Sequence, residues 1–98
     1  MVNFYLANDG VHKLVAEFDQ PYQLVKFGAY DYNDYTIYYQ IDPKLARQKK
    51  SSYLRRHRKN EDWEDPRTAG SLSKHILWGP TPSIEENIKR FIKKFNLY

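Results

Sequence analysis

The residues of this chain best suited to chemistry are basic side chains gathered in one stretch, residues 44–59. The sequence there, KLARQKKSSYLRRHRK, holds eight lysines or arginines and one histidine in sixteen positions. Clustered cations of this kind bind nucleic-acid phosphates or an acidic protein surface, and such binding needs no catalytic group. The candidate residues for binding a polyanion or an acidic partner are Arg47, Lys50, Arg55, Arg56, Arg58 and Lys59.

Three interpretations of this basic stretch stay open from the sequence. It can bind double-stranded DNA without sequence specificity, because cations on one accessible face neutralise backbone phosphates. It can dock onto an acidic protein surface. It can also be a solvated helix face, partly neutralised by the acidic residues that follow it, Glu61, Asp62, Glu64 and Asp65.

The charge of the whole chain is divided in the same way. Residues 1–43 hold two basic and six acidic side chains, a net charge of −4, whereas residues 44–98 hold fourteen basic and six acidic ones, a net charge of +8. Such a division suits contacts with unlike surfaces. We therefore expect the acidic half to meet basic neighbours and the basic helix to meet acidic ones.

Catalytic signals are weak by comparison, and the sequence predicts a protein that is not an enzyme. His57, Asn60 and His75 are of the types that hold a metal and activate water for phosphodiester cleavage. However, the strand-strand-helix context of such sites is missing, and no acidic pair stands at ligand spacing. The chain has no cysteine, so it has no thiol nucleophile and no thiolate metal site. No glycine-rich phosphate loop is present, and we expect no cofactor and no metal.

Aromatic residues form the second group of candidates. Trp63 and Trp78 flank a loop, where each can anchor a partner or pin the loop onto the core. Tyrosines crowd residues 29–41, but the acidic residues beside them would repel phosphates, so packing is favoured over base stacking.

The elements that position these residues begin with a predicted sheet. Residues 2–7, 11–18 and 23–28 read as strands, and the first two are joined by the strong turn signal Asn8-Asp9-Gly10. Between residues 29 and 41 the tyrosine spacing favours neither helix nor strand, and Thr36–Ile41 can add a fourth strand.

Helices are predicted for the rest of the chain. Asp42 followed by Pro43 is a good helix start, and the basic helix should run to about Lys59. Ser71 is expected to cap a short helix over residues 72–78. Ser83 and Glu86 have capping-box spacing at the start of a last helix. Its apolar stripe is Ile84, Ile88, Phe91, Ile92 and Phe95.

These elements predict one small α+β domain over residues 1–98, with an N-terminal antiparallel sheet of three or four strands packed by the C-terminal helices. Residues 1–41 form an acidic, tyrosine-rich β part, and residues 42–98 form a basic helical part. The N-terminus lacks the pattern of a secretory signal, and no apolar run is long enough to span a bilayer, so we expect a protein that is not secreted. The last helix should face Leu14, Val15, Phe18, Leu24, Val25 and Phe27, with Leu72, Ile76 and Trp78 closing one end.

The stretch from residue 53 to residue 97 resembles a small family of uncharacterised proteins encoded mainly by large DNA viruses of algae and amoebae. Its shared features are a Tyr-x-x-Arg-His start, an Asn-Glu-x-Trp step, a Thr-Ala-Gly turn and a Leu-Trp pair before a proline. The matching positions here are Tyr53, Arg56, His57, Asn60, Glu61, Trp63, Thr68, Ala69, Gly70, Leu77, Trp78 and Pro82, together with KFGAYDYNDYT at residues 26–36. The chain departs from the family by inserting IYYQIDP at residues 37–43.

The resemblance implies a viral origin and a structural role in the particle, as a minor capsid or internal virion protein whose partners are other virion proteins. It implies a location in the virion, or in the host cytoplasm or viral factory before assembly. It supplies no activity. The leading hypothesis is therefore a non-enzymatic structural component of a large DNA-virus particle, and the alternative is a non-specific nucleic-acid-binding accessory protein that uses the basic helix.

Overall fold

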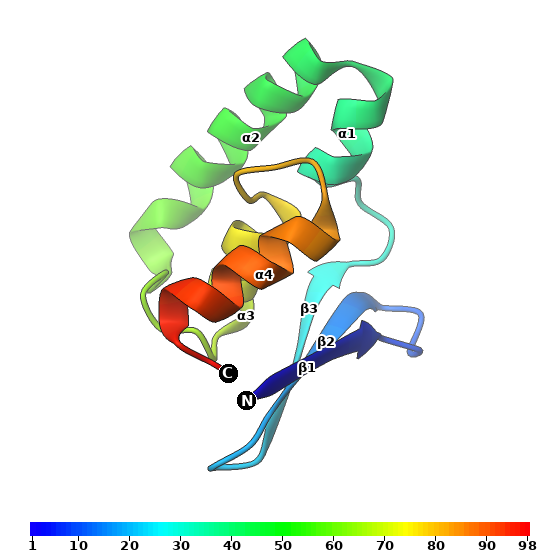
Figure 1. The fold of residues 1–98 in the computed structure, drawn as a ribbon. Helices are drawn as coiled ribbons and strands as arrows, with labels where there is room; N and C mark the ends of the chain where they lie inside the picture. Colours follow the sequence, from blue (N-terminus) through cyan, green and yellow to red (C-terminus); the bar gives the residue numbers. More distant parts are fainter.

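The computed structural model describes residues 1–98 and has the predicted α+β class. Three strands come first and the helices follow (Figure 1). A single 3₁₀ turn, Arg58–Asn60, extends the basic helix, and a π-helical turn, Ser73–Leu77, extends the third helix. The other elements are β1 (Val2–Leu6), β2 (His12–Phe18), β3 (Gln23–Ala29), α1 (Tyr35–Ile41), α2 (Pro43–His57), α3 (Ala69–Leu72) and α4 (Ile84–Phe95).

The sheet is an antiparallel meander in the order β1-β2-β3, which confirms the three predicted strands. Its first turn is held by Asp9, whose carboxylate accepts hydrogen bonds from the backbone N–H groups of Val11 and His12, both at 2.9 Å. These bonds and the imidazole of His12 hold the pKa of the Asp9 carboxyl well below its usual range. The turn therefore fixes the register in which Leu6 pairs with Leu14.

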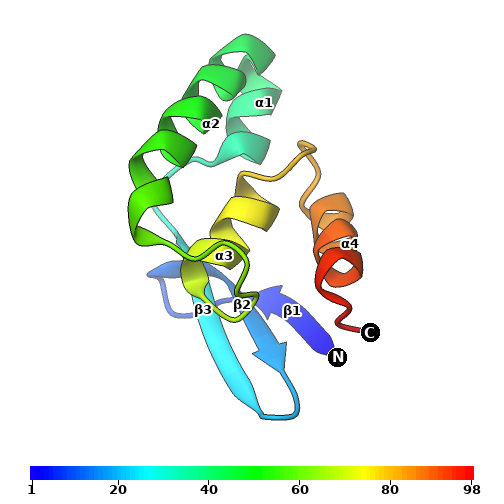
Figure 2. The ribbon, with the colours of Figure 1, turned by 90° about the vertical axis from the view of Figure 1, so that its left-hand side faces the viewer.

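The core lies between one face of the sheet and the helices α3 and α4 (Figure 2). Gly28, with a φ of 79°, lets β3 approach the π-helical turn closely, because an added Cβ would lie 2.6 Å from the Leu77 side chain. Phe4 of β1 meets Phe91 of α4 edge to face at 6.2 Å. The buried members of the core are Val2, Leu14, Ala16, Phe18, Phe27, Leu72, Ile76, Leu77 and Phe91.

Two residues expected under the last helix lie on the other face of the sheet. Side chains alternate along a strand, so Leu14 and Ala16 face the helices while Val15 between them faces away. Leu24 pairs with Glu17 on this second face and is 47% exposed. The prediction that Val15 and Leu24 pack against α4 was therefore wrong.

The suggestion of a fourth strand over Thr36–Ile41 was also wrong, because these residues form most of α1. Asp34 starts this helix: its carboxylate accepts from the backbone N–H groups of Thr36 and Ile37. Its other oxygen pairs with Lys13 of β2 at 2.6 Å, and the pair is largely buried. A buried, fully bonded cap outweighs the weak strand preference of the tyrosines.

Asp42 separates α1 from α2 and caps both helices. Its backbone N–H donates to the carbonyl of Tyr38, and its carboxylate accepts from the N–H of Lys44 at 3.0 Å. Pro43 disfavours helical geometry at the residue before it, which explains the break. The predicted start of the basic helix is confirmed, and its end falls at His57 rather than Lys59.

The short third helix begins earlier than expected. Thr68, not Ser71, is its cap, and the Thr68 hydroxyl accepts from the backbone N–H of Ser71 at 3.1 Å. Ser71 is fully buried inside the helix and donates its hydroxyl hydrogen to the carbonyl of Trp63. The predicted cap of the last helix is confirmed, since the Ser83 hydroxyl accepts from the N–H of Glu86.

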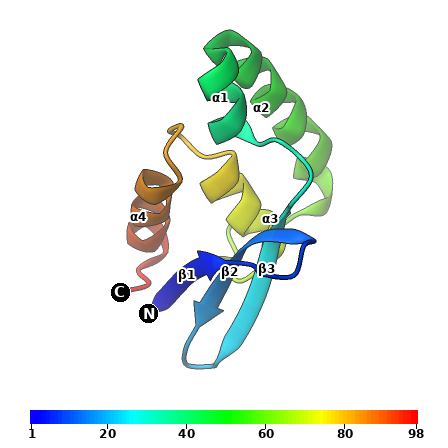
Figure 3. The same ribbon diagram turned by 90° about the vertical axis from the view of Figure 1, so that its right-hand side faces the viewer.

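Helices α1 and α2 form a hairpin that projects from the body of the molecule, as Figures 1 and 3 show. The ring of Tyr53 stacks on Trp78 at 4.5 Å, with the two planes 7° apart. The amine of Lys50 donates to the carbonyl of Gly79 at 2.7 Å. These contacts attach the hairpin to the end of the π-helical turn. No helix of the protein has the length and apolar character that crossing a membrane requires.

Candidate functional site

The outer face of α2 is the first candidate site. Helical spacing places Lys44 and Arg55 on the side of α2 opposite the buried Ala46, with Arg47 at the edge of that side, and all three are exposed. Arg58 and Lys59 continue this set in the 3₁₀ turn and are also exposed. We call these five residues the outer basic face. None of them forms an ion pair within the protein.

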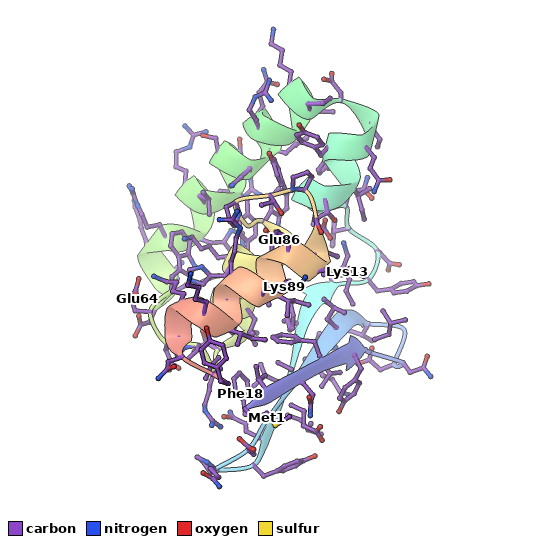
Figure 4. The ribbon with its side chains drawn as sticks, in the orientation of Figure 1. Met1, Lys13, Phe18, Glu64, Glu86 and Lys89 are labelled. Carbon is purple, nitrogen blue, oxygen red and sulfur yellow. The ribbon has the colours of Figure 1, made fainter.

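The acidic residues downstream of α2 have other partners. Glu61 accepts a hydrogen bond from the indole N–H of Trp63 at 2.7 Å. Asp62 and Asp65 accept from backbone N–H groups within their own loop. Glu64, labelled in Figure 4, lies 3.7 Å from the amine of Lys94 on α4. None of the acidic side chains in the loop after α2 therefore forms an ion pair with the outer basic face.

Two of the six predicted basic residues do not belong to the outer basic face. Lys50 points inward, with its amine bonded to Gly79 and 4.8 Å from the centre of the Tyr35 ring. Burial, and next the charge of Lys74, lower the pKa of the Lys50 amine. Arg56 lies on another flank of α2 and lines a cleft described below.

Trp63 and Trp78 both make contacts inside the molecule. The carbonyl of Trp63 accepts from the ring N–H of His75 at 2.9 Å, and its indole lies under the amine of Lys74. Trp78 stacks on Tyr53 and also lines the cleft. In this structure, then, Trp63 holds its loop to the helix at residues 69–77, and Trp78 holds the α1–α2 hairpin.

The two histidines considered for metal chemistry point to different places. His57 donates from Nδ1 to the carbonyl of Tyr53 one turn earlier, at 2.9 Å. His75 packs against Phe91 and Phe95, and burial lowers the pKa of its imidazole. No group of three or more histidine, aspartate or glutamate side chains is arranged to hold a metal ion.

A cleft of about 640 Å³ is the second candidate site. It lies where the end of β3 and the segment leading into α1 meet α2 and the helix at residues 69–77, and these elements adjoin one another in Figures 2 and 3. Helix α2 contributes Lys49, Ser52, Tyr53, Arg56 and His57. These residues are spaced three and four positions apart, so their side chains lie along one continuous flank of the helix. We call this flank the cleft face of α2.

Both acidic side chains in the cleft are already bonded. Asp34 pairs with Lys13, which lies at the end of the sheet nearest α1 (Figure 4). Glu61 is the acceptor for Trp63. Lys49 and Arg56 form no ion pair. Because the indole bonded to Glu61 is neutral, this carboxylate keeps its charge, and Lys49 and Arg56 together leave the cleft with a net charge of +1.

The aromatic wall of the cleft is formed by residues from two helices and the π-helical turn. Tyr53 is stacked between Trp78 and His57, whose ring centre lies 4.1 Å from its own. Burial, and next the charge of Glu61, raise the pKa of the Tyr53 phenol to about 12, so the hydroxyl stays protonated at neutral pH. Tyr38 adds a further ring, and Lys49 lies 5.6 Å from the centre of that ring.

The sequence predicted the basic helix but not this cleft. One signal was present, because polar and aromatic residues repeat along α2 at the spacing of one helix flank. Many cleft residues also fall in the stretches quoted for the viral resemblance, among them Gly28, Asp34, Arg56, Gly70 and Trp78. What was missing was the position of α1, because a strand over residues 36–41 would not place Tyr38 beside Trp78.

Comparison with known proteins adds no further information about the site. Neither protein-family models nor curated proteins nor solved structures gave a match to this chain.

Proposed function

We propose that this protein is a non-enzymatic nucleic-acid-binding protein that lays the outer basic face of α2 along backbone phosphates. One observation carries the proposal: the cations of this face are exposed and have no acidic partner within the protein. Unpaired cations on an accessible surface release the counterions of a polyanion when they bind it, which drives association without sequence recognition.

The composition of the face favours nucleic acid over an acidic protein partner. Between Lys44 and Lys59 its exposed positions carry cations, Gln48 and Ser51, and the one apolar side chain beside them, Leu54, is half-buried. Stable protein interfaces have an apolar or aromatic centre with a polar rim. Phosphate contacts need only cations and hydrogen-bond donors. The projection of the hairpin from the body makes the face accessible (Figure 3).

The proposal predicts that Arg47→Glu, Arg55→Glu and Arg58→Glu, combined in one variant, weaken binding to a duplex at least roughly tenfold, because each reversal replaces a phosphate contact with a repulsion. Binding by the unchanged protein should itself weaken roughly tenfold to a hundredfold between 50 and 200 mM salt. Fluorescence anisotropy with a labelled 20-base-pair duplex measures both effects.

The matched control places the same three changes on α4, as Lys89→Glu, Arg90→Glu and Lys93→Glu. These side chains are exposed, and the net charge changes by the same amount. Equal weakening in both triple variants would mean that only overall charge matters and would contradict a specific role for α2. Circular dichroism verifies that both variants are folded.

A second candidate function rests on a different surface. The sheet face turned away from the helices carries Tyr5 and Leu24, each nearly half exposed, beside the buried Val15, and it belongs to the acidic half of the chain. Such a face suits contact with other proteins. Together with the viral resemblance, it supports a structural component of a large DNA-virus particle, as a minor capsid or internal virion protein.

This second function predicts that the protein is present in purified particles in a fixed ratio to the major structural proteins, because an assembled component occupies a defined number of positions. Quantitative mass spectrometry of gradient-purified virions measures that ratio. A protein found in infected cells but absent from particles would exclude the structural role and leave the nucleic-acid role standing.

A further inference from the structure

The cleft beside α2 differs in chemistry from the outer basic face. Its volume of about 640 Å³ falls in the range of small-molecule sites, roughly 300–1,000 Å³. Aromatic rings and unpaired cations line the same space, whereas the outer basic face has cations alone. A ligand that uses all of this surface must combine a flat apolar part with a negative charge.

The cations of the cleft are placed for a phosphate at its edge. Lys49 and Arg56 are one heptad apart on α2, so both project from the same flank. Both are exposed and have no carboxylate partner, and the hydroxyl-bearing Ser52 lies between them on that flank. An arginine and a lysine beside a serine hydroxyl form a common set of donors for phosphate oxygens.

The aromatic residues are placed for a planar ring system. Trp78 and Tyr38 are 6.4 Å apart between ring centres, and both line the cleft. Tyr32 lies at its opening and is 74% exposed, so it is free to turn toward a bound ring. Stacking of a base on such side chains is favourable and tolerates any base, because every base has a π-face.

Anions without a ring, and rings without a charge, fit the cleft less completely. Inorganic phosphate would use Lys49 and Arg56 but leave the aromatic wall uncovered. An uncharged aromatic ligand would leave two cations unpaired beside it. Asp34 is neutralised by its ion pair with Lys13. Glu61 is hydrogen-bonded to the neutral indole of Trp63 and keeps its charge, but the two cations Lys49 and Arg56 outweigh it.

We propose that the cleft between α2, β3 and the helix at residues 69–77 binds a nucleoside phosphate, with the phosphate on Arg56 and Lys49 and the base against the wall formed by Tyr38 and Trp78. The nucleotide can be free in solution or an unpaired residue of a single strand, since both present the same base and phosphate. The site stands independently of duplex binding by the outer basic face.

The test is a titration of the full-length protein with adenosine monophosphate, followed by two-dimensional NMR and calorimetry. We expect saturable binding, with chemical-shift changes centred on Ser52 and the indole N–H of Trp78. Adenosine alone and inorganic phosphate should each bind at least tenfold more weakly, because each lacks half of the contacts. No binding at millimolar nucleotide, or equal affinity for phosphate alone, would overturn the proposal.

Neighbouring arginines supply the matched variants. Arg56→Gln should weaken nucleotide binding roughly tenfold or more, since a charged hydrogen bond is lost, whereas Arg55→Gln should leave it unchanged. Arg55→Gln should instead weaken binding to a duplex. Equal nucleotide affinity in both variants would overturn the site without affecting the proposal for the outer basic face, because the duplex measurement is separate.

The source of the nucleotide is decided by a third titration, with a single-stranded tetranucleotide. Tighter binding of the tetranucleotide than of adenosine monophosphate, lost in Arg56→Gln, assigns the cleft to an unpaired nucleotide within a strand. Equal affinities assign it to the free nucleotide. A tetranucleotide that binds equally well to Arg56→Gln and to the unchanged protein would contradict the strand assignment.

Discussion

Asn87→Leu is expected to destabilise the protein by about 3 kcal/mol or more, the largest effect we predict for one polar side chain. Asn87 is 0% exposed, at the end of the first turn of α4. Its amide nitrogen donates to the carbonyls of Ile76 and Thr81, and its oxygen accepts from the N–H and the hydroxyl of Thr81. Leucine would leave the buried carbonyl of Ile76 without this partner, and would remove three further bonds to the partly buried Thr81.

The physical role of this amide is to join three segments. It ties α4 to the end of the π-helical turn and to the loop at residues 79–83. Gly79 packs closely against this amide, because an added Cβ there would lie 2.8 Å from Cγ of Asn87. A small domain has about 5–15 kcal/mol of stability in total, so the loss of this junction removes a large part of it.

Thermal unfolding measures the effect. A loss of about 3 kcal/mol should lower the melting temperature by roughly 12–24 °C in a domain of this size. Asn60→Leu is the control, because Asn60 is exposed and makes no side-chain hydrogen bond within the protein. A melting temperature for Asn87→Leu within a few degrees of the Asn60→Leu value would show that the buried amide is not needed.

Asn87→Asp separates the hydrogen bonds from the shape of the side chain. A carboxylate keeps the two acceptor interactions but opposes two carbonyl oxygens with a buried charge. The folded state should therefore bind a proton more tightly than the unfolded state does, which raises the pKa of the introduced carboxyl. Stability is then lost as the pH rises above the ordinary pKa of aspartate, about 3.9. The gap between this variant and the unchanged protein should widen from pH 4 to pH 7.

The sheet and the last helix were predictable because their signals are local. The turn at Asn8-Asp9-Gly10 sets the first hairpin, and the alternation of Leu14, Ala16 and Phe18 sets the inner face of β2. Ser83 and the stripe that includes Phe91 define α4 in the same way. In each case the residues that decide the structure belong to the same hairpin, strand or helix and lie close together in the sequence.

Helix α1 was missed because its deciding contact is not local. Asp34 caps the helix, but it is fixed there by Lys13, twenty-one residues earlier on β2. The tyrosines of the segment read as strand or helix equally well until that pair is known. The prediction that Val15 faces α4 together with Leu14 failed for a related reason, since which strand face the helices cover is a property of the assembled domain.

The two candidate sites also differ in how far the sequence predicts them, because one depends on local residues and the other on contacts between distant segments. Four cations of the outer basic face, Arg47, Arg55, Arg58 and Lys59, are local in sequence and were predicted. Two other predicted cations lie elsewhere, since Lys50 bonds the carbonyl of Gly79 and Arg56 lines the cleft. Lys44 was not in the predicted set, although it lies on the same face. The cleft needs four segments to meet, so only its α2 flank, with Lys49 and Arg56, is visible in the sequence.

Trp78→Ala is expected to release the α1–α2 hairpin from the body and to cost about 3 kcal/mol, the lower end of the range for such truncations because Trp78 is half-buried. The hairpin is held mainly by the stack of Tyr53 on Trp78, by Lys50 on the Gly79 carbonyl and by the pair of Lys13 with Asp34. The stack is the only one of the three that is apolar.

Hydrogen exchange read by mass spectrometry distinguishes local release from general loss of stability. Amides in residues 35–57 should lose protection at least roughly tenfold more than those in α4, because regions with few contacts open independently. Trp63→Ala is the matched control, since that indole contacts Glu61 and Lys74 rather than the hairpin. Equal loss of protection in both regions would show that the hairpin and the body unfold together.

The consequence for binding follows from the position of Trp78, which belongs to one candidate site and not to the other. Its indole is part of the cleft wall, whereas the outer basic face lies on the opposite side of α2. Trp78→Ala should therefore abolish nucleotide binding in the cleft while duplex binding persists, because exposed cations do not need a fixed hairpin to contact phosphates. Loss of both activities would mean that duplex binding also depends on how the hairpin is held, and that the two sites act as one surface.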